Sequence, residues 1–370
     1  MTDTSRTLTQ DEKRSLYRDG FVIVKNAVAP DLVDAALRRI KAAKKGENLD
    51  STEEMTNLVN ASDITPILRE AMGQFDPPSA CQVGILELCK PGDHFDSFGY
   101  REKDQPYYAA ELHMDGLCTI AIPQEVQQGT PEEIYRRYIA SGPKGDLGRS
   151  PEIMGHNMVP LFMDPEMTLA IGSFTAFVFV CLNDQTREGC GQTALLRGAH
   201  HASERFFQWQ RAQNDHIGPE GPGWPRLNYD APNRCGLIYL PQAVSDQFID
   251  EDSETTPDGV RWPRPTQALM EPGDACITVF HMPHSGTRNE NGTESRKNII
   301  FRIRNKSRQP DKVVNGVSDH PDRGQHGEWL EYEEGNNPWK RSKDALCDQW
   351  AEWEGMQDIV AEERARELAD

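Results

Sequence analysis

The N-terminal part of the chain alternates between helical and extended patterns. Residues 9–20 begin with a threonine and two acidic side chains and stop at Gly20, which predicts a helix. The run FVIV at residues 21–24 predicts a short β-strand. From Pro30 to Ile40 apolar residues recur at helical spacing, which predicts a second helix.

Beyond residue 80 the pattern changes to short apolar runs, most of them bounded by Gly, Pro, Asn or Asp, which predicts β-strands. Two long excursions, at 123–160 and 203–262, interrupt these runs, and each contains one predicted helix, at Glu132–Ile139 and Ser203–Gln213. Helices followed by many short strands are typical of a mainly β protein with flanking helices. We therefore expect a double-stranded β-helix core, the cupin-like jelly roll. The predicted strands cover residues 81–89, 109–122, 166–172, 175–183, 192–196, 265–270, 274–280 and 297–304.

The end of the sequence is polar and closes in a predicted acidic helix at about 341–368, which carries two tryptophans. This helix packs either on the domain before it or on a partner, as in a homodimer. The expected organisation is one domain over residues 1–340, with insertions at about 123–160 and 203–262, followed by the C-terminal segment 341–370.

Charge and cysteine content narrow the class of partner. The chain has 40 basic and 59 acidic residues, a net charge of −19, which disfavours binding to nucleic acid or to an anionic membrane. The eight cysteines contain no C-x-x-C pair, as expected for reduced thiols. No apolar stretch has the length of a membrane span, and the N-terminal residues lack the apolar segment of a secretory signal. We therefore predict a cytoplasmic protein without nucleic-acid or membrane partners.

Two histidine–aspartate pairs have the spacing of neighbouring metal ligands. His113 and Asp115 lie in a predicted strand, where alternate side chains share a face, so both point the same way. His94 and Asp96 have the same spacing but lie among Ser, Gly and Asp in a predicted loop. We therefore prefer the first pair. A third ligand from a late strand would complete a 2-His-1-carboxylate facial triad, which leaves coordination positions open on non-haem Fe(II).

The segment from Gly273 to Asn289 offers two histidines as the third ligand, His281 and His284. Twelve residues beyond His284, Arg296 opens another apolar run. A guanidinium inside a barrel can bind a carboxylate in bidentate fashion. On the surface the same arginine would form only a weak salt bridge.

Five stretches of the chain follow one another in an order that carries a family resemblance. They are Leu8-Thr9-Gln10 with Asp19–Asn26, the H-x-D-G of His113–Gly116, Glu188–Gly191 with Arg197–His200, Gly273-Asp274 with His284-Ser285-Gly286 and Asn289, and Arg296. Together they resemble the phytanoyl-CoA dioxygenase-like family of Fe(II)/2-oxoglutarate-dependent oxygenases, over about residues 8–305.

The resemblance implies a ligand set. His113, Asp115 and His284 would hold Fe(II), and His284 is preferred to His281 because its spacing to Arg296 fits the family. Arg296 stands at the position of the arginine that pairs with the far carboxylate of the cosubstrate 2-oxoglutarate.

Further residues are implied around this set. Gln82 resembles a glutamine that touches 2-oxoglutarate in some relatives, and Asn298 could assist the cosubstrate carboxylate; a plain buried strand glutamine is the alternative for Gln82. His200 and His201 follow a turn of small residues, for which we expect a structural role at the rim of the pocket.

The implied activity is hydroxylation of a small-molecule substrate by O2, with release of succinate and CO2. Halogenating relatives have Gly or Ala at the position of Asp115, so a carboxylate there favours hydroxylation or a related desaturation or ring chemistry. The chain departs from the family in the long gap between His113 and His284, in Arg197 and in Leu112, and these departures concern the substrate. The alternatives are a non-catalytic metal-binding cupin-like module and a zinc-dependent hydrolase or isomerase on the same fold.

Overall fold

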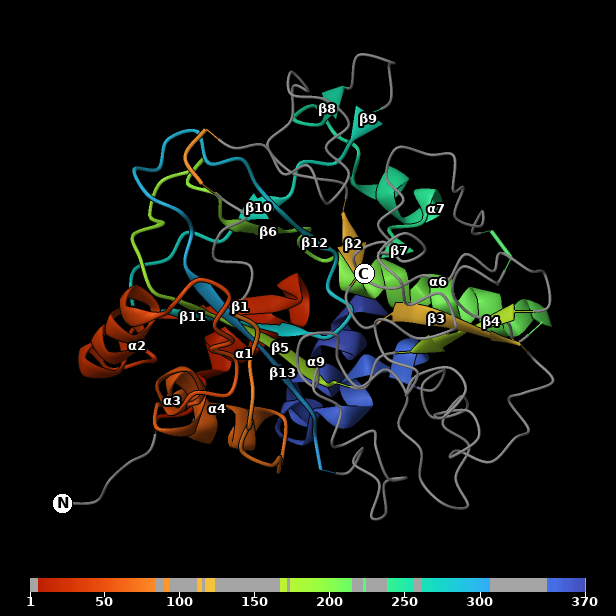
Figure 1. Ribbon diagram of the computed structural model, residues 1–370. Coiled ribbons are helices and arrows are strands. Elements are labelled where there is room, and N and C mark those ends of the chain that lie inside the picture. Colours follow the sequence, from red (N-terminus) through yellow and green to blue (C-terminus); the bar gives the residue numbers. More distant parts are fainter. Residues whose placement is uncertain are drawn as a thin grey trace.

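The computed structural model describes residues 6–83, 90–92, 112–114, 117–123, 167–171, 174–214, 222–223, 238–255, 261–306 and 345–369 (Figure 1). Several expectations from the sequence fall outside these residues: the helix at Glu132–Ile139, the His94/Asp96 pair, and Asp115.

Helices form the N-terminal part of the fold. Helix α1 (Gln10–Asp19) begins with a capping box, in which the Thr9 hydroxyl accepts from the Glu12 backbone N–H and the Glu12 carboxylate accepts from the Thr9 backbone N–H. It ends at Gly20, whose φ of 82° is the left-handed conformation that glycine adopts without strain. Three more helices flank the first sheet in Figure 1: α2 (Pro30–Ala42), α3 (Glu53–Asn60) and α4 (Ile64–Ala71).

One antiparallel sheet joins the two ends of the described sequence. Its strand order is β1-β11-β5-β13, so the first strand pairs with one of the last. These strands are almost entirely buried, which explains why they appear in the sequence as continuous apolar runs. The bounds are β1 (Phe21–Val24), β5 (Ala176–Cys181), β11 (Ala275–Val279) and β13 (Asn298–Ile303).

A second antiparallel sheet of very short strands faces the first one. The Phe177 ring on β5 lies 5.2 Å from the His284 ring on β12, measured between centroids, so side chains of the two sheets meet. The strand order of this second sheet is β10-β6-β12-β2-β7. The bounds are β2 (His113–Met114), β6 (Thr193–Leu195), β7 (Ile238–Tyr239), β10 (Thr266–Gln267) and β12 (His284–Gly286). Two separate hairpin-like pairs are β3 (Leu117–Pro123) with β4 (Met167–Ile171) and β8 (Glu254–Thr255) with β9 (Arg261–Trp262).

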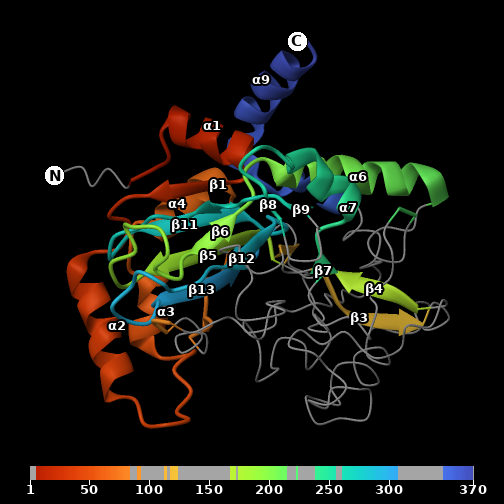
Figure 2. The same ribbon diagram turned by 90° about the horizontal axis from the view of Figure 1, so that it is seen from above.

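The C-terminal residues pack against α1 and the long helix α6 (Ala199–Asn214), as seen in Figures 1 and 2. The Tyr17 ring lies 5.3 Å from the Trp350 ring, and the Tyr17 hydroxyl donates to Glu367 at 3.4 Å. The single helix expected at 341–368 is broken in the structure. Its described part begins with helical residues at 345–347 and continues with two short 3-10 helices, η4 (Gln349–Glu352) and η5 (Glu354–Met356), and with α9 (Gln357–Glu367). The small helices α7 (Gln242–Ser245) and η3 (Asp246–Phe248) lie elsewhere.

The structure therefore has the predicted antiparallel sheets with flanking helices. The strand orders do not by themselves establish a jelly roll. The sequence patterns missed α3, α4 and β12, and they placed the start of α6 at 203 where the helix begins at Ala199. Among the described residues, no helix combines the length and the apolar character needed to cross a membrane.

Candidate functional site

Two histidines face each other between the sheets. His113 on β2 and His284 on β12 are direct partners in the antiparallel register, and their ring centroids are 4.4 Å apart. Each is only 6% exposed. Directly opposed residues on neighbouring strands point to the same face, so both imidazoles are directed into the same space.

The tautomer of His284 is set by a backbone contact. Its Nδ1 lies 2.8 Å from the carbonyl oxygen of Met282, and because a carbonyl can only accept, Nδ1 carries the proton. The second ring nitrogen, Nε2, then has the lone pair that a metal requires. The backbone therefore prepares this imidazole for coordination.

The third predicted ligand, Asp115, lies outside the described residues. Within the part of the chain that the structure describes, no group of three His, Cys, Asp or Glu side chains is arranged to hold a metal. The structure thus brings together the two predicted histidine ligands, and the complete triad stays a prediction.

Arg296 extends from the first sheet toward the second. It lies just before β13, is 4% exposed, and donates through Nη1 to the Thr193 hydroxyl on β6 at 3.4 Å. Thr193 is opposite Gly286 in the register, two residues along β12 from His284. At about 3.4 Å per residue, the guanidinium is therefore positioned roughly 7 Å along the strand from the histidine pair.

Asn298 lies two residues beyond Arg296, at the start of β13, and is 1% exposed. Its side-chain oxygen accepts from the Gln185 amide at 2.7 Å, and the same amide lies 3.0 Å from the Asn183 side-chain oxygen. No described residue accepts from Asn298 Nδ2, which is buried. Because a buried donor without an acceptor costs about 1–3 kcal/mol, this atom indicates a polar group that the chain itself does not supply.

Gln82 is placed away from Arg296. It bridges to Ile300 in the middle of β13, and its side-chain oxygen accepts from Arg302 Nη1 at 2.8 Å. The structure therefore brings Gln82 to Arg302, which the sequence offers, together with Arg304, as the alternative to Arg296 for the cosubstrate carboxylate. Residues 298, 300 and 302 lie on one face of the strand, so Arg302 shares a face with Asn298.

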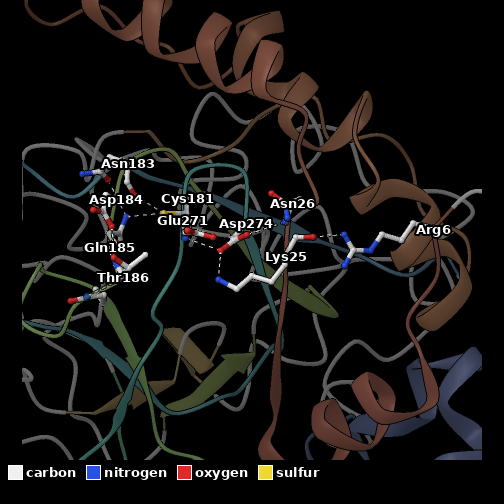
Figure 3. A network of polar contacts seen from close by, with 11 residues as sticks. Arg6, Lys25, Asn26, Cys181, Asn183, Asp184, Gln185, Thr186, Glu271 and Asp274 are labelled. Atoms are coloured by element: carbon white, nitrogen blue, oxygen red, sulfur yellow. Dashed lines mark hydrogen bonds and ion pairs between the residues drawn. The ribbon is translucent and has the colours of Figure 1, made fainter.

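The Gly-Asp position of the family resemblance, Gly273 and Asp274, serves the fold. Asp274 is fully buried and accepts from the Lys25 ammonium at 2.7 Å, from the Asn26 backbone N–H at 2.9 Å and from the Glu271 backbone N–H at 2.7 Å (Figure 3). This carboxylate ties the end of β1 to the turn before β11. Gly273 has a φ of 93°, and a Cβ there would lie 2.7 Å from the Val28 carbonyl oxygen.

The remaining histidines of the described part lie elsewhere. His200 and His201, at the start of α6, both donate through Nε2 to the Tyr17 carbonyl oxygen at 2.8 Å. Burial lowers the pKa of both, and most strongly that of His200, so they are neutral at pH 7. The His281 ring packs on Phe280, with 4.5 Å between centroids. His200 and His201 therefore join α6 to α1, and it is His284, not His281, that lies opposite His113.

Comparison with known proteins adds little to this picture. No family model matches the chain, and no curated protein matches it. The chain is similar to solved structures of HygX from Streptomyces hygroscopicus. The form with nickel and 2-oxoglutarate bound has 12% identity and a TM-score of 0.36, over 80% of this chain and 86% of that chain. The iron-bound form has 11% identity and a TM-score of 0.36, over 80% and 85% of the two chains. Likeness at this level assigns no function.

Proposed function

We propose that the chain is an Fe(II)- and 2-oxoglutarate-dependent dioxygenase of the phytanoyl-CoA dioxygenase-like family, with a double-stranded β-helix core. It hydroxylates a small-molecule substrate and releases succinate and CO2. The observation that carries this proposal is the opposed pair of His113 and His284 with the buried Arg296 directed into the same space between the sheets.

The donor set fits a non-haem iron. Imidazole suits Fe(II), and two histidines with one carboxylate form a facial triad. His113 and His284 supply the imidazoles, and Asp115, two positions after His113 in the sequence, supplies the carboxylate. The bond from His284 Nδ1 to the Met282 carbonyl fixes the ring orientation, as outer hydrogen bonds do at metal sites generally.

The buried polar atoms fit the cosubstrate. A guanidinium binds a carboxylate through two parallel N–H donors. The Arg296 guanidinium is buried beside Thr193. Asn298 Nδ2 is the buried donor two residues away for which no described residue provides an acceptor. A carboxylate oxygen bound to both side chains would satisfy that donor. Neither a zinc hydrolase nor a purely structural metal site has a need for such a carboxylate pocket.

The residues of the site have separate roles in the reaction. When bound, iron activates O2 and 2-oxoglutarate supplies two electrons through its decarboxylation. His113, Asp115 and His284 would hold the iron and would leave coordination positions open for the cosubstrate and O2. Arg296 and Asn298 hold the far carboxylate and thereby orient the keto acid. Buried side chains such as Phe177 exclude water from the histidines.

An anaerobic titration tests the proposal. Fe(II) and 2-oxoglutarate added to the protein should produce a visible charge-transfer band, and oxygen should then release succinate. His284→Ala should abolish the band and weaken metal binding at least about a hundredfold, because loss of an outer-shell partner alone costs 10–100-fold. His201→Gln, at a histidine that contacts Tyr17 instead, serves as the matched control and should keep the band.

Arg296 variants separate the cosubstrate from the metal. Arg296→Gln should raise the concentration of 2-oxoglutarate needed for half-maximal band formation about tenfold or more and leave the metal affinity unchanged. Arg296→Lys should recover only part of the loss, because an ammonium lacks the planar fork. Zinc-dependent turnover without a 2-oxoglutarate requirement, or metal binding that survives in His284→Ala, would refute the proposal.

A further inference from the structure

A second arginine lies on the same strand as the cosubstrate pocket but at its far end. Arg302 and Asn298 share one face of β13, four residues apart, and Arg296 precedes them. At about 3.3 Å per residue, Arg302 and Arg296 are separated by roughly 20 Å along the chain. Arg296 therefore lies just before the first residue of β13, whereas Arg302 is the last residue but one of this strand.

Aromatic rings connect Arg302 to the histidine pair. In the register Arg302 lies opposite Phe177 on β5, and its guanidinium carbon is 5.2 Å from the centre of the Phe177 ring. The centroid of the same Phe177 ring lies 5.2 Å from that of the His284 imidazole. The guanidinium and one of the candidate metal ligands therefore both contact the Phe177 ring.

Two further contacts orient this guanidinium. The ring of Phe174 lies 5.8 Å from the guanidinium carbon, and Gln82 accepts a hydrogen bond from Nη1 at 2.8 Å. Stacking on aromatic rings and one fixed hydrogen bond hold the planar group in a defined orientation. Arg302 is only half-buried, unlike its neighbours Phe301 and Ile303.

We propose that Arg302 binds an anionic group of the primary substrate, a carboxylate or a phosphate ester, on the opposite side of the histidine pair from Arg296. This inference rests on the proposed function. In a chain with a net charge of −19, an oriented cation beside the reacting centre attracts an anion that the rest of the surface repels. Arg296 serves the cosubstrate, because it is the more deeply buried of the two arginines and lies beside Asn298. Arg302 then serves the substrate.

The test uses matched anionic and neutral probes. Benzoate is compared with benzamide, and phenyl phosphate with phenol, by calorimetric titration into the anaerobic complex of the protein with Fe(II) and saturating 2-oxoglutarate. The wild-type protein should bind at least one anion about tenfold more tightly than its neutral partner. The pair with the larger ratio identifies the carboxylate or the phosphate ester as the preferred group.

The variants assign the preference to one side chain. Arg302→Gln should reduce the ratio to below about twofold, and Arg302→Lys should retain part of it because the charge remains without the fork. Lys306→Gln removes one exposed charge just beyond the same strand, where Lys306 pairs with Asp76, and should keep the full ratio. Circular dichroism of each variant confirms that the fold is kept.

Three results would overturn the inference. The first is equal binding of the anion and the neutral probe to the wild-type protein, and the second is a preference for the anion that persists in Arg302→Gln. The third is an Arg302→Gln variant that loses binding of 2-oxoglutarate and keeps binding of the probe. Failure of the proposed function is recognised separately. If no charge-transfer band forms, the titration of the probes is repeated without iron. A preference for the anion that is lost in Arg302→Gln would then still show the anion site, because Phe177 and Gln82 hold the arginine without a metal.

Discussion

Glu204 on α6 is a carboxylate at the contact between α6 and the C-terminal residues. It accepts from the Gln349 backbone N–H at 3.0 Å and lies 3.5 Å from Arg364. Burial raises its pKa to about 7, and the hydrogen bond from Gln349 and the charge of Arg364 offset only part of this effect. In the unfolded chain the same group titrates near 4.5.

This difference predicts a pH dependence of stability. Because the folded protein retains the Glu204 proton up to about pH 7 while the unfolded chain releases it near pH 4.5, the free energy of unfolding should fall between these values and level off above them. Glu204→Gln, whose amide oxygen can still accept from Gln349, should remove this slope and be more stable than wild type at pH 8 by roughly 3 kcal/mol. Urea unfolding at several pH values measures both quantities. Glu362→Gln, at an exposed carboxylate on α9, is the control, and an unchanged slope in Glu204→Gln would contradict the assignment.

Asp274 should be among the polar side chains whose loss is most destabilising. In Asp274→Asn an amide nitrogen replaces one oxygen and faces a backbone donor, either that of Asn26 or that of Glu271. We expect a loss of about 2–3 kcal/mol in the free energy of unfolding, measured by chemical denaturation. Asp76→Asn, whose exposed pair with Lys306 has the same charges, should cost less than about 1 kcal/mol. Equal costs for the two variants would show that burial of Asp274 does not matter.

At the level of single residues, the sequence identified side chains whose chemistry is carried by type and spacing. His113, His284 and Arg296 are of this kind, and the first two lie opposite each other in the structure. The partners of Asn298 and Arg302 could not be predicted. Gln185 meets Asn298 only because the segment after β5 folds back beside β13, and such a contact has no local sequence signal.

The second sheet shows what pattern reasoning misses at the level of elements. Strand β12 has three residues and β2 has two, too few for an alternation of apolar and polar positions to be seen. Pro283, directly before β12, also indicates a turn in place of a strand. The strands of the first sheet are long enough to be seen in the sequence, where four apolar runs correspond to its four strands.

The break in the C-terminal helix coincides with a close backbone contact. Gly355 in η5 passes so close to α4 that a Cβ atom there would lie 1.8 Å from the Glu70 carbonyl oxygen. The buried rings of Trp350 and Trp353 hold the segment at this position. A regular helix would move these groups away from α1 and α4, so tertiary contacts override the helical pattern of the sequence.

Gly355→Ala should therefore detach this segment. Since the obstructing atom belongs to the backbone, the clash cannot be relieved by a side-chain rotation, and we expect a loss of more than about 3 kcal/mol together with increased exposure of the two tryptophans. Tryptophan fluorescence and acrylamide quenching measure the exposure. Gly46→Ala is the control, because its added Cβ meets no atom within 4 Å and only the φ of 80° is strained, at about 1–2 kcal/mol. A red shift in both variants would point to a general loss of stability.

At the level of the whole molecule, the proposed site lies between the two sheets. His113 and His284 belong to the second sheet, whereas Asn298 belongs to the first and Arg296 lies just before the strand of Asn298. A metal with its keto acid would therefore link the sheets and bind only the folded chain. The sequence predicted sheets and helices of the right kind, but a strand order that joins residues far apart along the chain has no local signal.

Ligand binding across the sheets predicts a thermal shift. Ni(II) with 2-oxoglutarate, each at about a hundred times its dissociation constant, should raise the free energy of unfolding by about 2.7 kcal/mol per independent ligand and the midpoint by a few degrees. Differential scanning fluorimetry with and without EDTA measures the shift. His284→Ala should show none, and a shift of equal size in that variant would place the metal elsewhere.

The pairing of β1 with β11 has a consequence for the order in which the chain acquires its structure. Val24 is opposite Ala275, so about 250 residues separate the edge strand β1 of the first sheet from its neighbour β11. The loop that must close before this pairing contributes is long, and contacts of this kind slow folding. During synthesis the N-terminal helices and β1 emerge first but have no partner strand until β11 has left the ribosome. The apolar strand β1 is thus exposed for most of the time of synthesis, so slow refolding and aggregation at raised concentration are expected to originate at this strand.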